Sequence, residues 1–470
     1  MKIQYIKLLW NRVRSSFWFV SAMMTIGAVI LSISTLSIDK LLLKSITIRG
    51  WWLYTGGPDG ARTILSTIAG SMITVAGVVF SITIVVLSLA SSQFGPRLIR
   101  NFIDQRINQM VLGTFIATFV FCIIALQNIR DSGETYFVPY VSVTTGILLS
   151  MASLCVLIYF IHSISTSIRA NNIIARVSVE LEASIERIFP EEYGSDRSKN
   201  DRALEDLVEE QGYISEKYYR EISSVASERS GYLVAYDIDE LLDIAVKKDV
   251  LIRVDHRPGD FITGRNPLLW IWPENRLDEK LGKKLKSAFV MDSERTSEQD
   301  IEYPIHLLVE IAVRALSPGI NDPFTAITCI DWLGEALSKL AGKKMHGPFY
   351  FDEDGKIRVI TKPVTFPGVV DAAFNQIRQN AATVPAVSLR LLESIGAIAH
   401  QVRQDEHRKV LLHHAEMIFR ACKENVFGEK DRLDIQERRN RVFEILSRRE
   451  SFQVESIIGR SLEKKFSKFL

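Results

Sequence analysis

The sequence predicts a multi-domain membrane protein in which a four-helix α transmembrane unit precedes an α+β cytoplasmic domain. The 470-residue chain is 47% hydrophobic, which is more than an ordinary soluble protein of this length carries. The apolar residues are concentrated before about residue 168, in four stretches without Asp, Glu, Lys or Arg. Each stretch exceeds the roughly 20 residues that a bilayer requires. The remaining residues have the mixed pattern of a globular protein and can bury a core of their own.

These changes in pattern divide the chain into five segments. We expect a four-helix transmembrane domain (1–168), an amphipathic stem helix (169–190), a linker (191–222), a small β module (223–300) and a mainly helical cytoplasmic domain with a β-hairpin (301–470). The uncharged stretches themselves are residues 15–38, 63–95, 107–129 and 135–168.

Basic residues and cysteines indicate the orientation. Lys and Arg precede the first stretch, separate the second from the third, and follow the fourth, which places both termini in the cytoplasm. The loop after the first stretch is also basic, so this signal is imperfect. The four cysteines lie far apart and form no disulfide or zinc pattern, which also favours a cytosolic location for the large domain.

The second stretch carries the candidate functional face. At 3.6 residues per turn its small and hydroxylated residues fall within about a quarter of the helix circumference. The pore-lining or helix-packing candidates are Ser66, Gly70, Thr74, Gly77, Ser81 and Ser88. Small residues let membrane helices pack closely, and the same face repeated around an axis would line a weakly polar path. The face has no acid or base, so it has no charged selectivity ring.

The cytoplasmic end of this stretch is a candidate hinge. Gly95 and Pro96 end the helix, and Arg97 and Arg100 follow on one side of a charged turn. The alternative is an interfacial elbow that only anchors the helix at the headgroups.

The stem and the β module follow. Apolar residues spaced by three and four predict that the fourth membrane helix continues as an amphipathic stem to Pro190. Residues 231–236 and 251–254 are typical of strands, Asp237 of a helix cap, and 256–272 of turns alternating with short strands. This arrangement resembles half of a barrel-sandwich module, as in lipoyl, biotinyl and membrane-fusion domains. The lysine that would carry a prosthetic group is missing, so we expect no cofactor.

The last segment is mainly helical by its periodicity. We expect helices over 303–315, 324–340, 369–380, 386–406 or beyond, and 432–448, with a hairpin in 347–365. Between the first two, Asp322 suits an N-cap and Pro323 the first helical position. The alternative is an anion or interdomain contact site formed by Arg314, Ser317, Asn321 and Asp322 at an exposed helix N-terminus.

Several classes of function are not supported by the residues. Glu393, His400, His407 and His414 lie seven apart, which on one helix predicts a solvent or interface stripe, because successive members are roughly 10 Å apart and cannot share a metal. A net charge of +2 gives no reason to expect nucleic-acid binding. No nucleophile elbow, HExxH motif or phosphate loop is present, so we expect neither an enzyme nor a metal site.

Five segments together resemble a known family. They are Ser91-Ser-Gln-Phe-Gly-Pro-Arg-Leu-Ile-Arg-Asn-Phe, Arg257-Pro-Gly-Asp-Phe, Arg295-Thr-x-x-Gln-Asp300, Arg314-Ala-Leu-Ser-Pro-Gly-Ile-Asn-Asp-Pro-Phe-Thr-Ala326 and Val384-Pro-Ala-Val-Ser-Leu-Arg390. The chain resembles the uncharacterised bacterial predicted membrane proteins called domain of unknown function 2254. The resemblance implies a multi-pass inner-membrane protein with a cytoplasmic domain, and it implies no activity.

The sequence therefore leads to two hypotheses. The first is an oligomeric ion channel or transport protein with a cytoplasmic regulatory domain, whose partners are the lipid bilayer, further copies of the chain and a small ion or solute. The alternative is a non-conducting signalling or scaffold protein whose cytoplasmic domain binds a partner or ligand.

Overall fold

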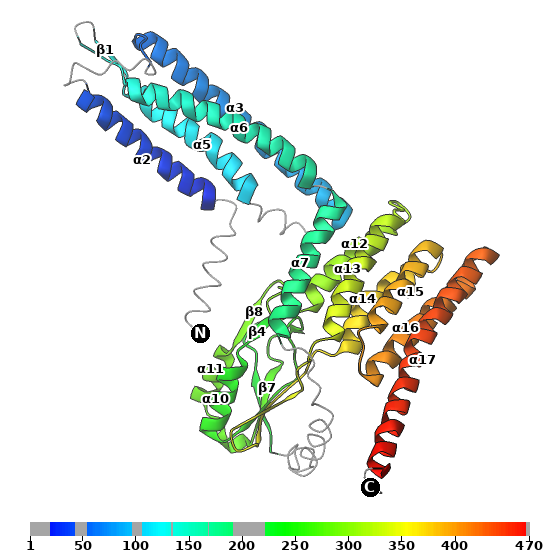
Figure 1. The fold of residues 1–470 in the computed structure, drawn as a ribbon. Helices are drawn as coiled ribbons and strands as arrows, with labels where there is room; N and C mark the ends of the chain where they lie inside the picture. Colours follow the sequence, from blue (N-terminus) through cyan, green and yellow to red (C-terminus); the bar gives the residue numbers. More distant parts are fainter. Residues whose placement is uncertain are drawn as a thin grey trace. The chain divides into compact units, whose positions relative to one another are not determined.

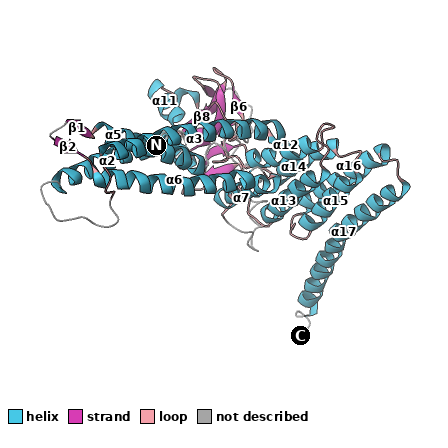
Figure 2. Ribbon diagram, turned by 90° about the horizontal axis from the view of Figure 1, so that it is seen from above, coloured by secondary structure: helices cyan, strands magenta, loops and turns pink. Residues whose placement is uncertain are grey.

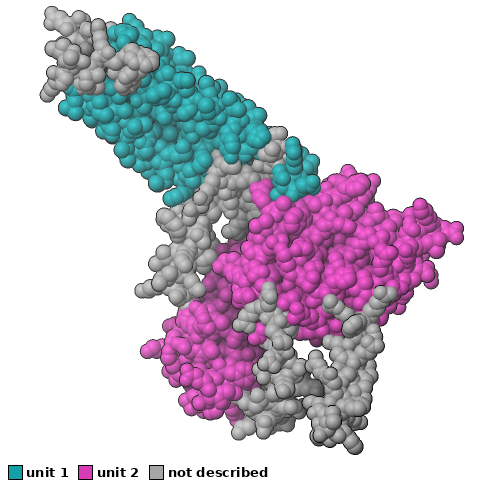
Figure 3. Space-filling model, in the orientation of Figure 1, with its two compact units in different colours: residues 1–172 teal, residues 173–470 magenta. Residues whose placement is uncertain are grey.

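The computed structural model describes residues 19–42, 54–95, 106–132, 135–167, 169–190 and 221–466, with side chains as far as residue 447. The chain forms two compact units, which are residues Met1–Asn172 and Ile173–Leu470. Figure 3 colours unit 1 teal and unit 2 magenta.

Four helices of membrane-spanning length form most of the described part of unit 1 and run alongside one another (Figure 1). They are α2 (Phe19–Leu42), α3 (Pro58–Phe94), α5 (Arg106–Gln127) and α6 (Tyr140–Ser167). The prediction of four apolar helices long enough to cross a membrane is thus confirmed. The fourth begins later than expected, because Thr135–Phe137 (β2) pairs with Arg130–Ser132 (β1) in a short hairpin ahead of α6.

Helix α5 makes the most extensive contacts in this bundle, with α2 and α3, and it also packs against α6. Two glycines mark where the helices approach most closely. A Cβ atom on Gly113 would lie 2.7 Å from Met24 Sδ on α2, and one on Gly146 would lie 3.0 Å from Leu65 Cδ2 on α3. Small residues are therefore required at these two places inside the bundle.

Unit 2 contains two open sheets, drawn in magenta in Figure 2. The first has the order β3-β7-β5-β10-β9 and the second β6-β4-β8. The strands are β3 (Ser223–Ala226), β4 (Gly231–Tyr236), β5 (Leu251–Val254), β6 (Phe261–Ile262), β7 (Pro267–Trp272), β8 (Phe289–Asp292), β9 (Phe349–Phe351) and β10 (Ile357–Thr361).

The expected barrel-sandwich module is not what these strands form. The predicted hairpin of the last segment is present as β9 and β10, but β10 pairs in parallel with β5, with Val359 opposite Ile252. This non-local pairing extends an open sheet with strands from outside residues 223–300. Helices α10 (Ile238–Lys248) and α11 (Glu279–Ser287) contribute Leu241 and Leu285 to the same core, and η2 (Glu274–Arg276) follows β7. Asp237 caps α10 as predicted, accepting from the Glu240 amide at 3.1 Å.

The rest of unit 2 is an array of helices (Figure 1). They are α12 (Glu302–Ala315), α13 (Pro323–Ala341), α14 (Phe366–Asn380), α15 (Pro385–Ala399), α16 (Asp405–Asn425) and α17 (Glu429–Phe466). Helix α12 packs on α13 and α14, and α15 packs on α13, α16 and α17. The β-sheets and these helices belong to one unit, so unit 2 is a mixed α+β structure.

The prediction of one histidine stripe is wrong. The expected helix over 386–406 is two helices, because a turn after Ala399 separates α15 from α16. His407 is only 6% exposed and stacks on the Phe366 ring at 4.2 Å between centroids. His414 is 1% exposed, with Nε2 3.0 Å from Asp371 Oδ1. Both are core residues of unit 2, whereas His400 caps the end of α15.

The stem is a helix of its own, α7 (Ala170–Ile188), and not a continuation of α6, which ends at Ser167. Polar Asn171 and Asn172 lie in the first turn of α7, directly after Ala170, and asparagine favours helix ends over helix interiors. The predicted amphipathic face is confirmed, since Ile174, Val177 and Leu181 are buried. Most of the predicted linker, 191–220, lies outside the described residues.

Candidate functional site

The small-residue face of α3 points away from the rest of its own chain. All six candidate residues on it are exposed: Ser66, Gly70, Thr74, Gly77, Ser81 and Ser88. A Cβ atom added to Gly70 or Gly77 would meet nothing within 4 Å. The buried face of the helix is a different one, formed by Ala61, Leu65, Ala69, Met72, Ala76, Val79, Thr83, Ala90 and Phe94. Packing within the subunit therefore does not explain the small residues, in contrast to Gly113 and Gly146.

Several hydroxyls on this side of α3 bond to the helix itself. Thr74 Oγ1 donates to the Gly70 carbonyl at 2.8 Å, and Ser66 Oγ donates to the Thr63 carbonyl at 3.0 Å. Each hydroxyl keeps acceptor capacity after such a bond. The face is therefore compatible with lipid or another helix, and it can also accept hydrogen bonds from water.

The hinge candidates are described only in part. Gly95 ends α3 with a φ of 110°, a conformation that strongly favours glycine, and its amide donates to the Ser91 carbonyl at 3.1 Å. Pro96, Arg97 and Arg100 lie outside the described residues, so the hinge stays a prediction.

The Arg314 to Ala326 turn has the predicted cap. Asp322 Oδ1 accepts from the Thr325 amide at 3.2 Å and Oδ2 from the Thr325 hydroxyl at 2.6 Å, with Pro323 at the first helical position of α13. Asn321 takes a positive φ of 49° in the turn. Ser317 Oγ donates to the Arg314 carbonyl at 2.6 Å, and Arg314 Nε lies 3.5 Å from Glu310. The carboxylate of Asp322 thus already occupies the N-terminus at which an external anion would bind.

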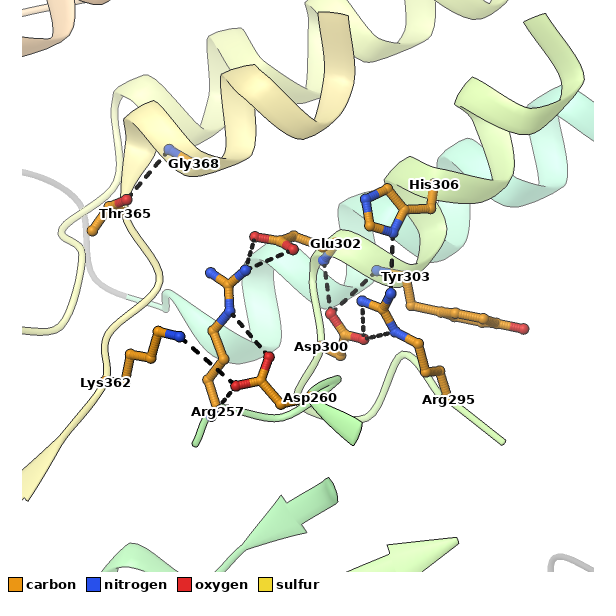
Figure 4. A network of polar contacts seen from close by, with 10 residues as sticks. All are labelled: Arg257, Asp260, Arg295, Asp300, Glu302, Tyr303, His306, Lys362, Thr365 and Gly368. Carbon is orange, nitrogen blue, oxygen red and sulfur yellow. Dashed lines mark hydrogen bonds and ion pairs between the residues drawn. The ribbon is translucent and has the colours of Figure 1, made fainter. Parts of the chain in front are cut away.

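Two other family-like motifs meet in a polar network that sequence reasoning did not identify as a site (Figure 4). Arg257, in the loop after β5, directs its guanidinium to Glu302 on α12, with Nη2 2.7 Å from Oε1. Its backbone amide donates to Asp260 at 3.1 Å, and Lys362 Nζ, beyond β10, lies 3.9 Å from the same carboxylate. The network therefore connects the carboxyl ends of the parallel strands β5 and β10 to the helical array.

Asp300 is the most buried acid of this network, at 4% exposed. One oxygen accepts from the amides of Glu302 and Tyr303 at the start of α12, at 3.0 and 3.2 Å. The other accepts from Arg295, with Nη2 at 2.7 Å. Arg295 Nη1 also lies 3.1 Å from His306 Nδ1. Asp300 is thereby held by the helix N-terminus and by a cation at once.

Gly259 fits this network for two reasons. Its φ is +97°, which L side chains rarely adopt, and a Cβ atom there would lie 2.4 Å from Asp300 Oδ2. The glycine of the Arg257-Pro-Gly-Asp motif therefore lets one motif touch the other. The sequence did contain a signal for this network. One motif places Arg257 and Asp260 around a glycine, and the other places Arg295 and Asp300 just before the start of α12.

The electrostatics of the network are those of a buried ion-pair cluster. Burial raises the pKa of Asp300, and Arg295 opposes that rise. Burial likewise raises the pKa of Glu302, against the lowering effect of Arg257. Each acid has an arginine partner, and within the described ranges no group of three His, Cys, Asp or Glu could hold a metal ion. The network joins elements and shows no open catalytic constellation.

Comparisons with known proteins agree with the membrane unit and with the motifs. The model of the family DUF2254, described as a predicted membrane protein, matches residues 14–397. Uncharacterised proteins of Mycobacterium bovis and Mycobacterium tuberculosis are 28% identical to this chain over 418 residues, covering 87% of this chain and 77% of theirs. No solved structure gives a significant match. With more than half of its length matched by the family model, the chain belongs to the DUF2254 family of predicted membrane proteins.

Proposed function

We propose that this protein is an oligomeric channel or transport protein of the bacterial inner membrane. In this proposal α3 helices from several copies surround an axis and line a weakly polar path for a small ion or solute. Both termini are cytoplasmic, and unit 2 regulates assembly or opening. The proposal excludes an enzymatic role.

The observation that carries the proposal is the exposure of the small-residue face of α3. On the other membrane-length helices many exposed residues are large and apolar, as expected for lipid contact, for example Ile30 at 60% and Ile158 at 69%. Small exposed residues occur there too, such as Gly27 on α2, but on α3 they follow one face of the helix. Gly70, Thr74 and Gly77 instead present backbone and a hydroxyl to the same surroundings. Such a surface favours close contact between helices of different copies or contact with water over contact with lipid.

Ion flux in liposomes tests the proposal, with Gly77→Leu compared against a matched variant. Gly27 on α2 is also exposed, and a Cβ atom there also meets nothing within 4 Å, so Gly27→Leu adds the same side chain outside the small-residue face. We expect flux through the wild type and Gly27→Leu, and reduced flux through Gly77→Leu. Equal flux through both variants, or none through the assembled wild type at varied pH and voltage, contradicts the proposal.

A non-conducting scaffold is the second candidate, and the satisfied hydroxyls of α3 favour it. Because Thr74 and Ser66 bond to carbonyls of their own helix, the face can associate without water. This alternative predicts that Gly77→Leu weakens self-association, measured by cross-linking in membranes, while the wild type conducts nothing.

A further inference from the structure

We propose that unit 2 binds a small organic phosphate in a cavity between the end of α7, the loop after β5 and the β9–β10 hairpin. The cavity has a volume of about 390 Å³, which is within the range of small-molecule sites. Its lining includes three cations (Arg187, Arg257 and Lys362), one acid (Glu298) and the rings of Tyr236, Tyr350 and His346. The inference concerns unit 2 alone and holds whether or not the membrane unit conducts.

One side of the cavity is cationic. Arg257 is committed to Glu302, but the other two cations are less neutralised. Arg187 Nη2 donates to the neutral Ser297 carbonyl at 2.6 Å and Ser184 hydroxyl at 3.2 Å. Lys362 is 56% exposed and lies 3.9 Å from Asp260, which is too far for a strong hydrogen bond. Two flexible cations at one cavity suit a phosphate dianion.

Another side of the cavity is aromatic and hydroxylated. Tyr236, Tyr350 and Thr361 line this side. Burial raises the pKa of Tyr236 to about 12. Phe189 and His346 stack with their ring centroids 5.9 Å apart. Phe189 is 2% exposed and supports His346 from inside, whereas the rings of His346, Tyr236 and Tyr350 are at least partly exposed and offer a surface for a planar or apolar body.

The combination determines the ligand class. A bare anion would use the cations and leave the aromatic side unfilled. A neutral aromatic molecule would leave Arg187 bonded to neutral groups and Lys362 with the Asp260 carboxylate 3.9 Å away. A molecule that joins a phosphate to a planar body matches both. Gln299 also lines the cavity, but its side-chain amide is hydrogen-bonded to the backbone of Tyr236. Gln299 Oε1 accepts from the Tyr236 amide and Nε2 donates to the Tyr236 carbonyl, each at 3.1 Å, so this side chain forms part of the wall and is not available to the ligand.

Calorimetric titration of the full-length protein in detergent tests the site with phenyl phosphate, adenosine 5′-monophosphate and inorganic phosphate as probes. We expect saturable binding of at least one organic phosphate, at least tenfold tighter than inorganic phosphate. Arg187→Gln and Lys362→Gln should each weaken that binding at least tenfold. Lys356→Gln is the matched control, since Lys356 is an exposed lysine on the same hairpin that does not line the cavity.

Lys362→Gln keeps the test decisive if Arg187→Gln perturbs α7. The Lys362 ammonium lies 3.9 Å from Asp260, so the substitution breaks no close hydrogen bond to that acid. Absence of saturable binding by both organic probes to folded wild type overturns the proposal. So does binding that both variants leave unchanged, or inorganic phosphate binding as tightly as the organic probes.

Discussion

Asp39 on α2 caps the start of α6 through Ser142. Its Oδ2 accepts from the Ser142 hydroxyl at 2.7 Å and from the Ser142 amide at 3.0 Å, and Oδ1 accepts from the Val141 amide at 2.8 Å. The carboxylate is 4% exposed and therefore satisfies helix-end donors that would otherwise be unpaired. A helix cap supplied by a neighbouring helix fixes the two helices together.

Asp39→Ala should accordingly destabilise unit 1. Loss of a buried carboxylate leaves two backbone amides without partners, which costs about 2–3 kcal/mol. Denaturant titration of the full-length protein in micelles measures the change. Asp59→Ala is the control. The Asp59 side chain is 90% exposed and forms an ion pair with Arg62 at 3.6 Å, and an exposed pair of this kind contributes little to stability. Equal stability of the two variants would show that the Asp39 cap is unimportant.

Gly259→Ala should destabilise unit 2 by about 3 kcal/mol or more, because it combines a positive φ with a steric clash. Gly355→Ala separates these two effects. Gly355 also has a positive φ, of +77°, but a Cβ atom there meets nothing within 4 Å. We expect about 1 kcal/mol for Gly355→Ala in the same thermal unfolding assay. If both variants lose the same stability, Gly259 is not needed for the approach to Asp300.

The stability of unit 2 should depend on the Glu302 carboxylate, because it neutralises the charge of Arg257. Removing one partner of a buried ion pair leaves the other charge unpaired, so Glu302→Ala should cost about 3 kcal/mol in stability. Lys283 and Glu279 form an exposed pair at 2.6 Å, with both side chains more than 70% exposed, and Glu279→Ala is the control. A loss for Glu302→Ala no larger than that of the control would argue against the network as a link between sheet and helices.

His407 should make the stability of unit 2 depend on pH. Burial lowers its pKa from 6.5 to about 4. The unfolded chain therefore binds a proton between these values that the folded chain does not, and stability present above pH 6.5 is lost as the pH falls toward 4. At pH 5 the loss is about 2 kcal/mol, since 1.5 pKa units separate that pH from 6.5.

Thermal unfolding of the wild type and of His407→Phe between pH 7.5 and pH 5 measures this effect. The phenylalanine preserves the stack on Phe366 and removes the titrating group. We expect the variant to lose less stability over this range than the wild type. An identical decline in both proteins would show that His407 does not contribute.

Local signals in the sequence predicted most of the elements. Continuous apolar stretches gave the four spans, and cap residues such as Asp237 and Asp322 placed helix starts correctly. Non-local contacts explain where prediction failed. The parallel pairing of β10 with β5 joins residues more than 100 positions apart, and no local sequence motif predicts such a pairing.

The same reason explains the missed network and the wrong histidine stripe. Arg257 and Glu302 come from separate elements, so their pairing depends on the tertiary fold. For His407 and His414, the seven-residue spacing was real, but the turn after Ala399 broke the helix on which the argument depended. The small-residue face of α3 was visible in the sequence, whereas its exposure was not.

Thiol accessibility at Ser81 tests the central claim most directly. Ser81 lies on the small-residue face, and its neighbour Ile82, 43% exposed, lies about 100° further round the helix. Cysteines would be introduced at each position in a Cys155→Ser background, because Cys155 is exposed and the other three native cysteines are buried. The assembled protein in liposomes would then be treated with a membrane-impermeant thiol reagent.

If the small-residue face of α3 lines a water-filled path, the reagent should modify Ser81→Cys and reduce flux. Ile82→Cys, which in this account faces lipid, should stay unmodified. A Ser81→Cys variant that assembles normally and is as unreactive as Ile82→Cys would contradict it.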